Sequence, residues 1–172
     1  MRFKNHLFIQ SPLLTRRRLV QVLAGGAALT ALDAALPAWA QDGIKPVRFE
    51  VWKDPNCGCC RDWIAHMEQN GFRATVHDTG GNAARARVGL PRRYGSCHTA
   101  LIGGYVVEGH VPASEIKRLL REKPQAALGL AVPGMPIGAP GMDAPAYRGR
   151  RDPYDTLLVL RDGSSRVFQS HS

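Results

Sequence analysis

Three cysteines fall within four residues, at the point where a strand-like segment gives way to a helix-like one. The stretch is 54-DPNCGCCRDWIAHM-67, and it contains Cys57, Cys59 and Cys60. Residues 47–54 alternate apolar and polar side chains, which predicts a strand. Over residues 60–71, apolar side chains recur with the spacing of one helix face. The cysteines are therefore expected between the first strand and the first helix, in a tight turn.

The segments that follow predict a compact α/β layout. Residues 72–78 predict a second strand, residues 82–88 a short helix, residues 97–109 two strands joined by a tight turn, and residues 113–123 a third helix. Residues 128–155 are rich in proline and glycine and predict a long loop, and residues 156–171 predict a C-terminal hairpin. This order, with cysteines at the end of the first strand, resembles thioredoxin-like proteins. We therefore predict an α/β (α+β) fold with a central mixed sheet flanked by helices.

The first 40 residues have the composition of an export signal. Basic residues, including the run 15-TRRRLV-20, precede a weakly apolar segment that ends in 38-AWA-40. The pair Arg16 and Arg17 resembles a twin-arginine signal. Asp33 makes the segment a poor membrane span, because one Asp at a helix centre costs about 2.5–3.5 kcal/mol. We predict a cleaved signal peptide over residues 1–40, a single periplasmic domain over residues 41–172, and no stable membrane anchor after cleavage.

The positive charge of the chain does not indicate a nucleic-acid partner. The 23 Lys and Arg residues against 14 Asp and Glu residues give a formal net charge of +9, and part of it belongs to the leader. Beyond residue 40 the basic residues are scattered, apart from short clusters near residues 85–93 and 148–151. A nucleic-acid site needs a basic stripe, usually with aromatic side chains among it. We therefore predict no nucleic-acid binding.

The fourth cysteine, Cys97, opens the predicted third strand in 95-GSCHTA-100. In a thioredoxin-like topology this strand starts beside the helix that carries the cysteine motif, so all four sulfurs should meet. Several kinds of site remain open at this point. Structural disulfides suit an exported chain, and a C-x-x-C formed by Cys57 and Cys60 suits a thiol–disulfide oxidoreductase. Clustered thiolates suit a soft metal such as copper, and four cysteines also match the ligand count of a [2Fe–2S] cluster.

Two features favour copper among these alternatives. Cys59 is redundant for thiol exchange but serves well as a further neighbouring thiolate. The long loop also repeats the triplet P-G-M, which places Met135 and Met142, and thioether ligands favour Cu(I) over zinc. The sequence therefore predicts a site of clustered thiolates with thioethers nearby.

The histidines near the cysteines are weaker candidates. His98 adjoins Cys97, but neighbouring side chains of a strand point to opposite faces, so His98 can ligate the same ion only if the strand is irregular there. His110 lies between the predicted hairpin and the third helix. We expect it to make a structural hydrogen bond, with a copper contact as the alternative.

Four motifs in order resemble the CopG-like copper-resistance family, periplasmic metal-binding proteins formerly grouped as a domain of unknown function. They are C-G-C-C after 54-DPN-56, then S-C-H-T-A, then 105-YVVEGHVPASEIKRLL-120, then L-A-V-P-G-M-P-x-G-x-P-G-M, within a resemblance over residues 46–170. The resemblance implies a thioredoxin-like domain whose cysteines bind Cu(I), with a multinuclear copper cluster as one form of the site. It also implies a role in copper resistance or homeostasis, with other periplasmic copper-handling proteins as partners. It suggests interconversion of Cu(I) and Cu(II), and leaves open whether the protein is a copper oxidoreductase. The predicted metal ligands are Cys57, Cys59, Cys60, Cys97, Met135, Met142 and His98.

Overall fold

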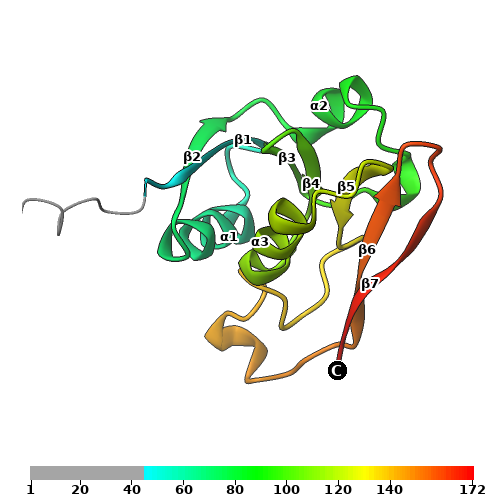
Figure 1. Cartoon of the computed structure of the whole chain (residues 1–172). Helices are drawn as coiled ribbons and strands as arrows, with labels where there is room; N and C mark the ends of the chain where they lie inside the picture. The colour runs from blue at the N-terminus through cyan, green and yellow to red at the C-terminus, as the bar shows by residue number, and fades with distance from the viewer. Residues whose placement is uncertain (1–44) are drawn as a thin grey trace, which may run out of the picture. The chain divides into compact units, whose positions relative to one another are not determined.

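The structure is a computed structural model that describes residues 45–172 (Figure 1). The predicted signal peptide, residues 1–40, lies outside the described residues. Within residues 45–172, one mixed sheet contains seven strands in the order β2-β1-β3-β4-β5-β6-β7. The strands are β1 (Val47–Lys53), β2 (Phe72–His77), β3 (His98–Ile102), β4 (Tyr105–Glu108), β5 (Ala127–Ala131), β6 (Tyr154–Leu160) and β7 (Ser165–His171). The helices are α1 (Gly58–Gln69), α2 (Gly81–Arg87) and α3 (Ala113–Glu122), with short 3₁₀ turns η2 (Arg92–Tyr94) and η3 (Pro145–Tyr147).

The first four strands have the thioredoxin-like arrangement that the sequence predicted. Strands β1 and β2 are parallel and joined through α1, β3 runs antiparallel beside β1, and β4 runs antiparallel beside β3. Strand β5 then follows α3 and pairs in parallel with β4. The predicted C-terminal hairpin is formed by β6 and β7, which extend the sheet beyond β5. The prediction of a mixed sheet flanked by helices is therefore confirmed.

Side chains on the two faces of the sheet belong to two different cores. Helices α1 and α3 lie side by side over one face in Figure 1. On that face Trp63 and Met67 of α1 and Ile116 of α3 pack with Phe49 and Ala100 from the strands. The opposite face carries a smaller cluster built from Leu90, Tyr94, Val106, Ala131 and Val159. Because successive strand residues point to opposite faces, the same strands supply both cores.

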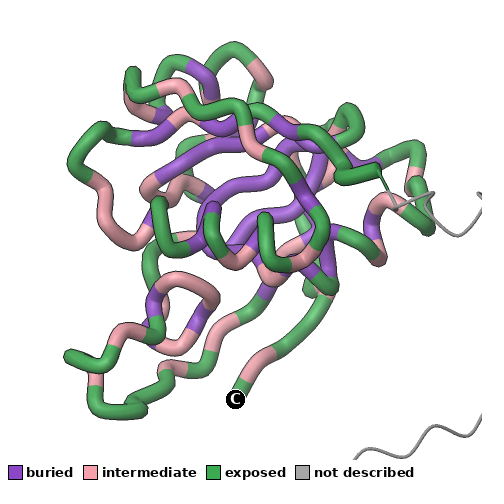
Figure 2. The backbone as a smooth tube through the Cα atoms, turned by 90° about the vertical axis from the view of Figure 1, so that its left-hand side faces the viewer, coloured by how far each residue is buried: buried purple, intermediate pink, exposed green. Residues whose placement is uncertain are grey.

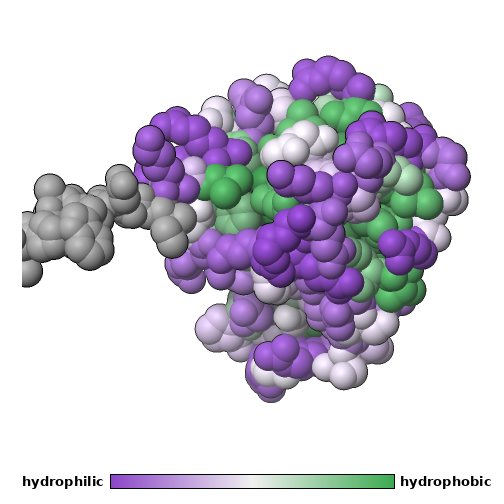
Figure 3. Space-filling view, viewed as in Figure 1, coloured by the Kyte–Doolittle hydropathy of each residue, from purple (hydrophilic) through white to green (hydrophobic). Residues whose placement is uncertain are grey.

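Burial is concentrated on the central strands, as Figure 2 shows. Trp63, Met67, Ile116 and Leu119 are fully buried, and each such side chain contributes about 1.5–3 kcal/mol relative to an exposed one. Hydrophilic and hydrophobic residues intermingle on the face of the molecule seen in Figure 3. Within residues 45–172, none of the helices is both long enough and apolar enough to span a bilayer.

The start of the predicted long loop is a strand instead. We expected a loop over residues 128–155, but Ala127–Ala131 forms β5. Gly129 explains the error, because glycine in a short segment usually indicates a loop. Here Gly129 pairs with Val106 of β4, and a Cβ at position 129 would overlap the Val106 carbonyl. The backbone of β4 therefore approaches too closely for any other residue, and the true long loop begins after Ala131.

We predict that Gly129→Ala destabilises the domain by about 1–3 kcal/mol or more, because the added methyl group has no room in a packed core. The control is Gly149→Ala. Gly149 has a φ of 75° and open space at the Cβ position, so its replacement should cost about 1 kcal/mol of backbone strain alone. Urea unfolding of the full chain measures both. Equal losses for the two variants would show that close packing does not explain Gly129.

Candidate metal centre

The first three cysteines sit on the first turn of α1 because a tight turn leads into the helix. The Asn56 amide donates to the Asp54 carboxylate at 2.8 Å, and the Cys57 amide donates to the Asp54 carbonyl at 3.0 Å. Cys57 is the N-cap residue of α1, with φ −70° and ψ 99°. Cys59 and Cys60 follow within the first helical turn. The turn and the helix together bring these three sulfurs to one end of α1.

Two of the four cysteines are joined in a disulfide. Cys57 and Cys60 are bonded, with their Cα atoms 5.4 Å apart, a usual separation for a disulfide. Cys60 is fully buried, while Cys59 and Cys97 are half-buried free thiols. In this redox state the cluster therefore has two thiols and one disulfide rather than four thiols.

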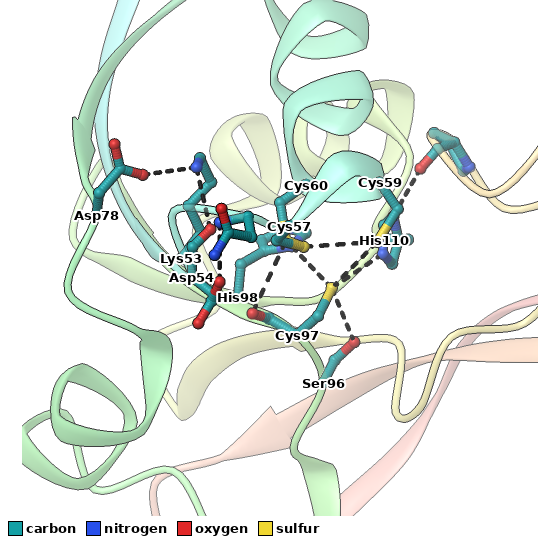
Figure 4. Close-up of a disulfide and its surroundings, with 12 residues drawn as sticks. Lys53, Asp54, Cys57, Cys59, Cys60, Asp78, Ser96, Cys97, His98 and His110 are labelled. Carbon is teal, nitrogen blue, oxygen red and sulfur yellow. Dashed lines mark hydrogen bonds and ion pairs between the residues drawn. A yellow bond between two sulfur atoms is a disulfide. The ribbon is translucent and has the colours of Figure 1, made fainter.

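Cys97 reaches the cluster from the segment directly before β3, as the topology predicted. Its sulfur lies 4.0 Å from the Cys59 sulfur, and the Cys59 sulfur lies 3.6 Å from the Cys57 sulfur. The Cys60 sulfur lies 3.9 Å from the Cys97 carbonyl oxygen. Because β3 pairs with β1, the residue just before β3 lies beside the start of α1. Figure 4 shows Cys59 and Cys97 directed toward one another.

Two buried imidazoles complete the cluster. The Cys97 sulfur lies 3.3 Å from Nδ1 of His98 and 3.1 Å from Nε2 of His110 (Figure 4). Cys97 precedes the first residue of β3, so the alternation of strand side chains does not separate it from His98. This is the irregularity that a shared site would require. Our expectation of a structural hydrogen bond for His110 is met by its Nδ1, which lies 2.8 Å from the Pro140 carbonyl.

Burial controls the protonation of these groups. Burial lowers the pKa of His98 to about 3, and the neighbouring His110 adds to this effect. Burial also lowers the pKa of His110, so both rings are neutral at pH 7. The pKa of the Cys97 thiol rises to about 12, first because it is buried and second because Cys59 lies beside it. Without a metal the Cys97 sulfur is therefore a protonated thiol beside two neutral imidazoles.

A fully buried carboxylate holds the segment that carries Cys97. Oε1 of Glu108 accepts hydrogen bonds from the Ser96 amide at 2.6 Å and from Nε of Arg85 at 2.9 Å. Oε2 accepts from the Thr99 hydroxyl at 2.6 Å. Nη2 of Arg85 also donates to the Ser96 carbonyl at 2.7 Å. The residues on both sides of Cys97 are thus tied to one buried ion pair.

The long loop lies against the cluster at several points. The Ser96 hydroxyl donates to the Gly134 carbonyl, and the Gly134 amide donates to the Gly95 carbonyl at 3.2 Å. Gly141 is so close to α1 that a Cβ there would lie 2.7 Å from the Cys59 carbonyl oxygen. Of the two predicted loop ligands, Met135 is 53% exposed and Met142 is buried. Their roles as ligands stay predictions.

The structure brings five of the seven predicted metal ligands together, namely the four cysteines and His98, and it adds His110. The atoms of Cys57, Cys59, Cys60 and Cys97 lie within 4.8 Å of one another, and so do those of Cys97, His98 and His110. Ligands that share one tetrahedral metal lie about 3.5 Å apart, given bonds of about 2.0–2.3 Å, so the unbonded contacts of 3.1–4.0 Å are near the spacing of shared ligands. His110 carried only a weak signal in the sequence, as a polar residue in a turn directly after β4.

The fold and the cluster define the class as a thioredoxin-like protein with a thiol and imidazole site. Residues 94–142 match the family model described as "Protein of unknown function, DUF411". Two solved structures match with 43% identity and a TM-score of 0.67, and both are named copper resistance protein copG. Form 2 covers 74% of this chain and 99% of its own, and Form 1 covers 73% and 98%. No curated protein matches the chain. The chain therefore belongs to the CopG copper-resistance family, which confirms the resemblance seen in the sequence.

We predict that Glu108→Gln destabilises the domain by about 3–5 kcal/mol, because Arg85 would keep a buried charge without its partner. The side chain of Arg85 is 12% exposed and that of Glu108 is 0% exposed. The control is Glu122→Gln, which breaks an exposed pair with Arg118 and should cost less than about 1 kcal/mol. Urea unfolding compares the variants, and a loss for Glu108→Gln as small as that of the control would rule out this role.

Proposed function

We propose that the protein binds copper as Cu(I) through Cys57, Cys59, Cys60 and Cys97, and that it acts in copper resistance or homeostasis. The observation that carries this proposal is the meeting of four sulfurs from two distant segments of the chain. Thiolates favour soft metals, among them Cu(I), zinc and the iron of iron–sulfur clusters. The matched relatives are named as copper resistance proteins, which supports the same metal. Sulfur atoms 3.6–4.0 Å apart also allow thiolates to bridge more than one copper ion.

Binding through four thiolates requires that the Cys57–Cys60 disulfide is first reduced. The disulfide accepts two electrons and two protons and gives two thiols, and a dithiol reductant supplies both. The thiols then release protons as they bind the metal. The thiol of Cys97, whose pKa is raised to about 12, releases its proton to solvent only when a strongly bound ion takes the proton's place. A soft cation with high affinity for thiolate fits this requirement.

The loop methionines are proposed to line the approach to the cluster. Met135 follows Gly134, which contacts Ser96 beside Cys97. Its thioether is exposed to solvent, while that of Met142 is buried. We propose that the exposed Met135 meets copper first and that the buried Met142 contributes a second thioether. Met135→Leu and Met142→Leu, compared by anaerobic chelator competition for Cu(I), test the two roles separately.

Export and redox chemistry extend the same proposal. The leader over residues 1–40 supports delivery to the periplasm, where other copper-handling proteins would be partners. We also propose that the protein interconverts Cu(I) and Cu(II). The imidazoles of His98 and His110 beside the Cys97 sulfur support this hypothesis, because imidazole also suits copper.

We predict that the reduced full chain binds Cu(I) in anaerobic chelator competition, and that Cys97→Ser weakens this binding by about tenfold or more, since a supporting interaction of a metal ligand is already worth about 10–100-fold. Elemental analysis gives copper per chain. The control is Met67→Leu, which removes a sulfur buried in the core at little cost in stability. Full, equally tight copper binding by Cys97→Ser would remove Cys97 from the site.

The Cys57–Cys60 disulfide favours thiol–disulfide exchange as a second candidate function, because the half-exposed Cys57 and the buried Cys60 form a C-x-x-C at a helix N-terminus. We predict that the metal-free chain reduces insulin no faster than a simple dithiol does, since Cys59 and Cys97 compete for the same disulfide. Cys59→Ser removes one of these two competitors and should reduce insulin faster than the wild-type chain. Rapid turnover by the metal-free wild-type chain would favour the second candidate instead.

A further inference from the structure

Cys97, His98 and His110 form a ligand group that does not use the disulfide. Each offers one atom, and the three atoms lie within 4.8 Å of one another. The two sulfur–nitrogen distances are 3.1 and 3.3 Å. A sulfur and a nitrogen that share one metal ion lie about 3.5 Å apart, given bonds of about 2.0–2.3 Å. Shifts of a few tenths of an ångström would therefore open a site for an ion.

His110 is already oriented as metal-ligating histidines are. A carbonyl oxygen only accepts hydrogen bonds, so Nδ1 must carry the ring proton and donate a hydrogen bond to the Pro140 carbonyl oxygen, 2.8 Å away. The neutral ring then carries a lone pair on Nε2, which faces the Cys97 sulfur. Histidine ligands typically donate their second ring N–H to a carbonyl or carboxylate, which fixes the tautomer and the ring orientation. The loop that contains Pro140 thus fixes His110 in the form that can ligate.

His98 is hard to explain by stability alone. Its ring is fully buried and packs against Trp63, with centroids 4.4 Å apart. Among the described residues, Nε2 of His98 has no hydrogen-bond partner. A buried polar atom without a partner costs about 1–3 kcal/mol. An apolar side chain would avoid this cost, so a ligand role at Nδ1 gives a reason for an imidazole at this position.

The disulfide decides which donors are available. In this structure the sulfurs of Cys57 and Cys60 are bonded to each other and cannot act as thiolates. The donors that remain near one point are Cys97, His98 and His110, with the Cys59 sulfur 4.0 Å from that of Cys97. Imidazole suits copper generally, and one thiolate with two imidazoles and a weaker fourth ligand is the donor set of copper sites that transfer electrons.

We propose that the disulfide form binds a single copper ion through Cys97, His98 and His110, with Cys59 as the fourth ligand. This inference rests on the proposed function, in which the reduced form binds copper through four thiolates. Reduction of the Cys57–Cys60 disulfide by a dithiol therefore changes the donors from sulfur and nitrogen to sulfur alone. Cys59 and Cys97 belong to both sets and stay on the copper ion.

X-ray absorption at the copper edge tests the proposal on the unmodified full chain. The chain is kept in its disulfide form, loaded anaerobically with one equivalent of Cu(I), and checked by peptide mapping for an intact Cys57–Cys60 bond. We expect nitrogen and sulfur neighbours together, with the outer-shell scattering of imidazole. A shell of sulfur alone would overturn the proposal, and no variant has to fold for this result.

A variant pair gives a second readout. His110→Ala should weaken Cu(I) binding to the disulfide form by about tenfold or more, while changing the affinity of the reduced form much less. The control is His77→Ala, since the His77 ring stacks on Trp52 and contacts Glu50 rather than the cluster. Equal affinity of the disulfide form with and without the His110 ring would also overturn the proposal.

The two hypotheses fail in different ways. If the reduced wild-type chain does not bind Cu(I), the proposed function is wrong. If the reduced chain binds Cu(I) but the disulfide form shows no nitrogen donors, the four-thiolate function stands and this inference alone is wrong.

Discussion

The buried carboxylate of Glu108 is the interaction on which the cluster depends. It accepts hydrogen bonds from Arg85, the Ser96 amide and the Thr99 hydroxyl, so it fixes the backbone on both sides of Cys97. A carboxylate buried without such donors would be very costly, and here all its partners come from α2, β3 and the segment before β3. The position of Cys97 relative to α1 is therefore set by a polar network inside the domain, and not by the cluster itself.

The two parts of the site lie on different elements of the fold. Cys97, His98 and His110 are held by strands β3 and β4 and by the loop carbonyl of Pro140. Cys57, Cys59 and Cys60 lie at the N-cap and in the first turn of α1. In the scheme we propose, this sulfur and nitrogen group and the neighbouring cysteine turn would give one protein two distinct sets of copper donors.

Much of this could be predicted from the sequence because the relevant signals are local. The alternation in residues 47–54 and the helical spacing of Cys60, Trp63, Ile64 and Met67 reflect one buried face each, and both elements are confirmed. Strand β5 could not be predicted, because Gly129 resembles a loop residue and the close approach of Val106 is a long-range effect. His110 was undervalued for the same reason. Its partners, Cys97 and Pro140, are 13 and 30 residues away in the chain.

The sequence by itself determined the order of the elements, the cysteine motif at the start of α1 and the family, because periodicity and short motifs are properties of neighbouring residues. Only the tertiary structure decided which donors meet. It paired Cys57 with Cys60, left Cys59 and Cys97 as thiols, and placed two neutral imidazoles on the Cys97 sulfur. The physical reason is that hydrogen bonding, burial and ligand distance depend on separation in space. The pairing of β3 with β1 and the fold-back of the long loop set that separation.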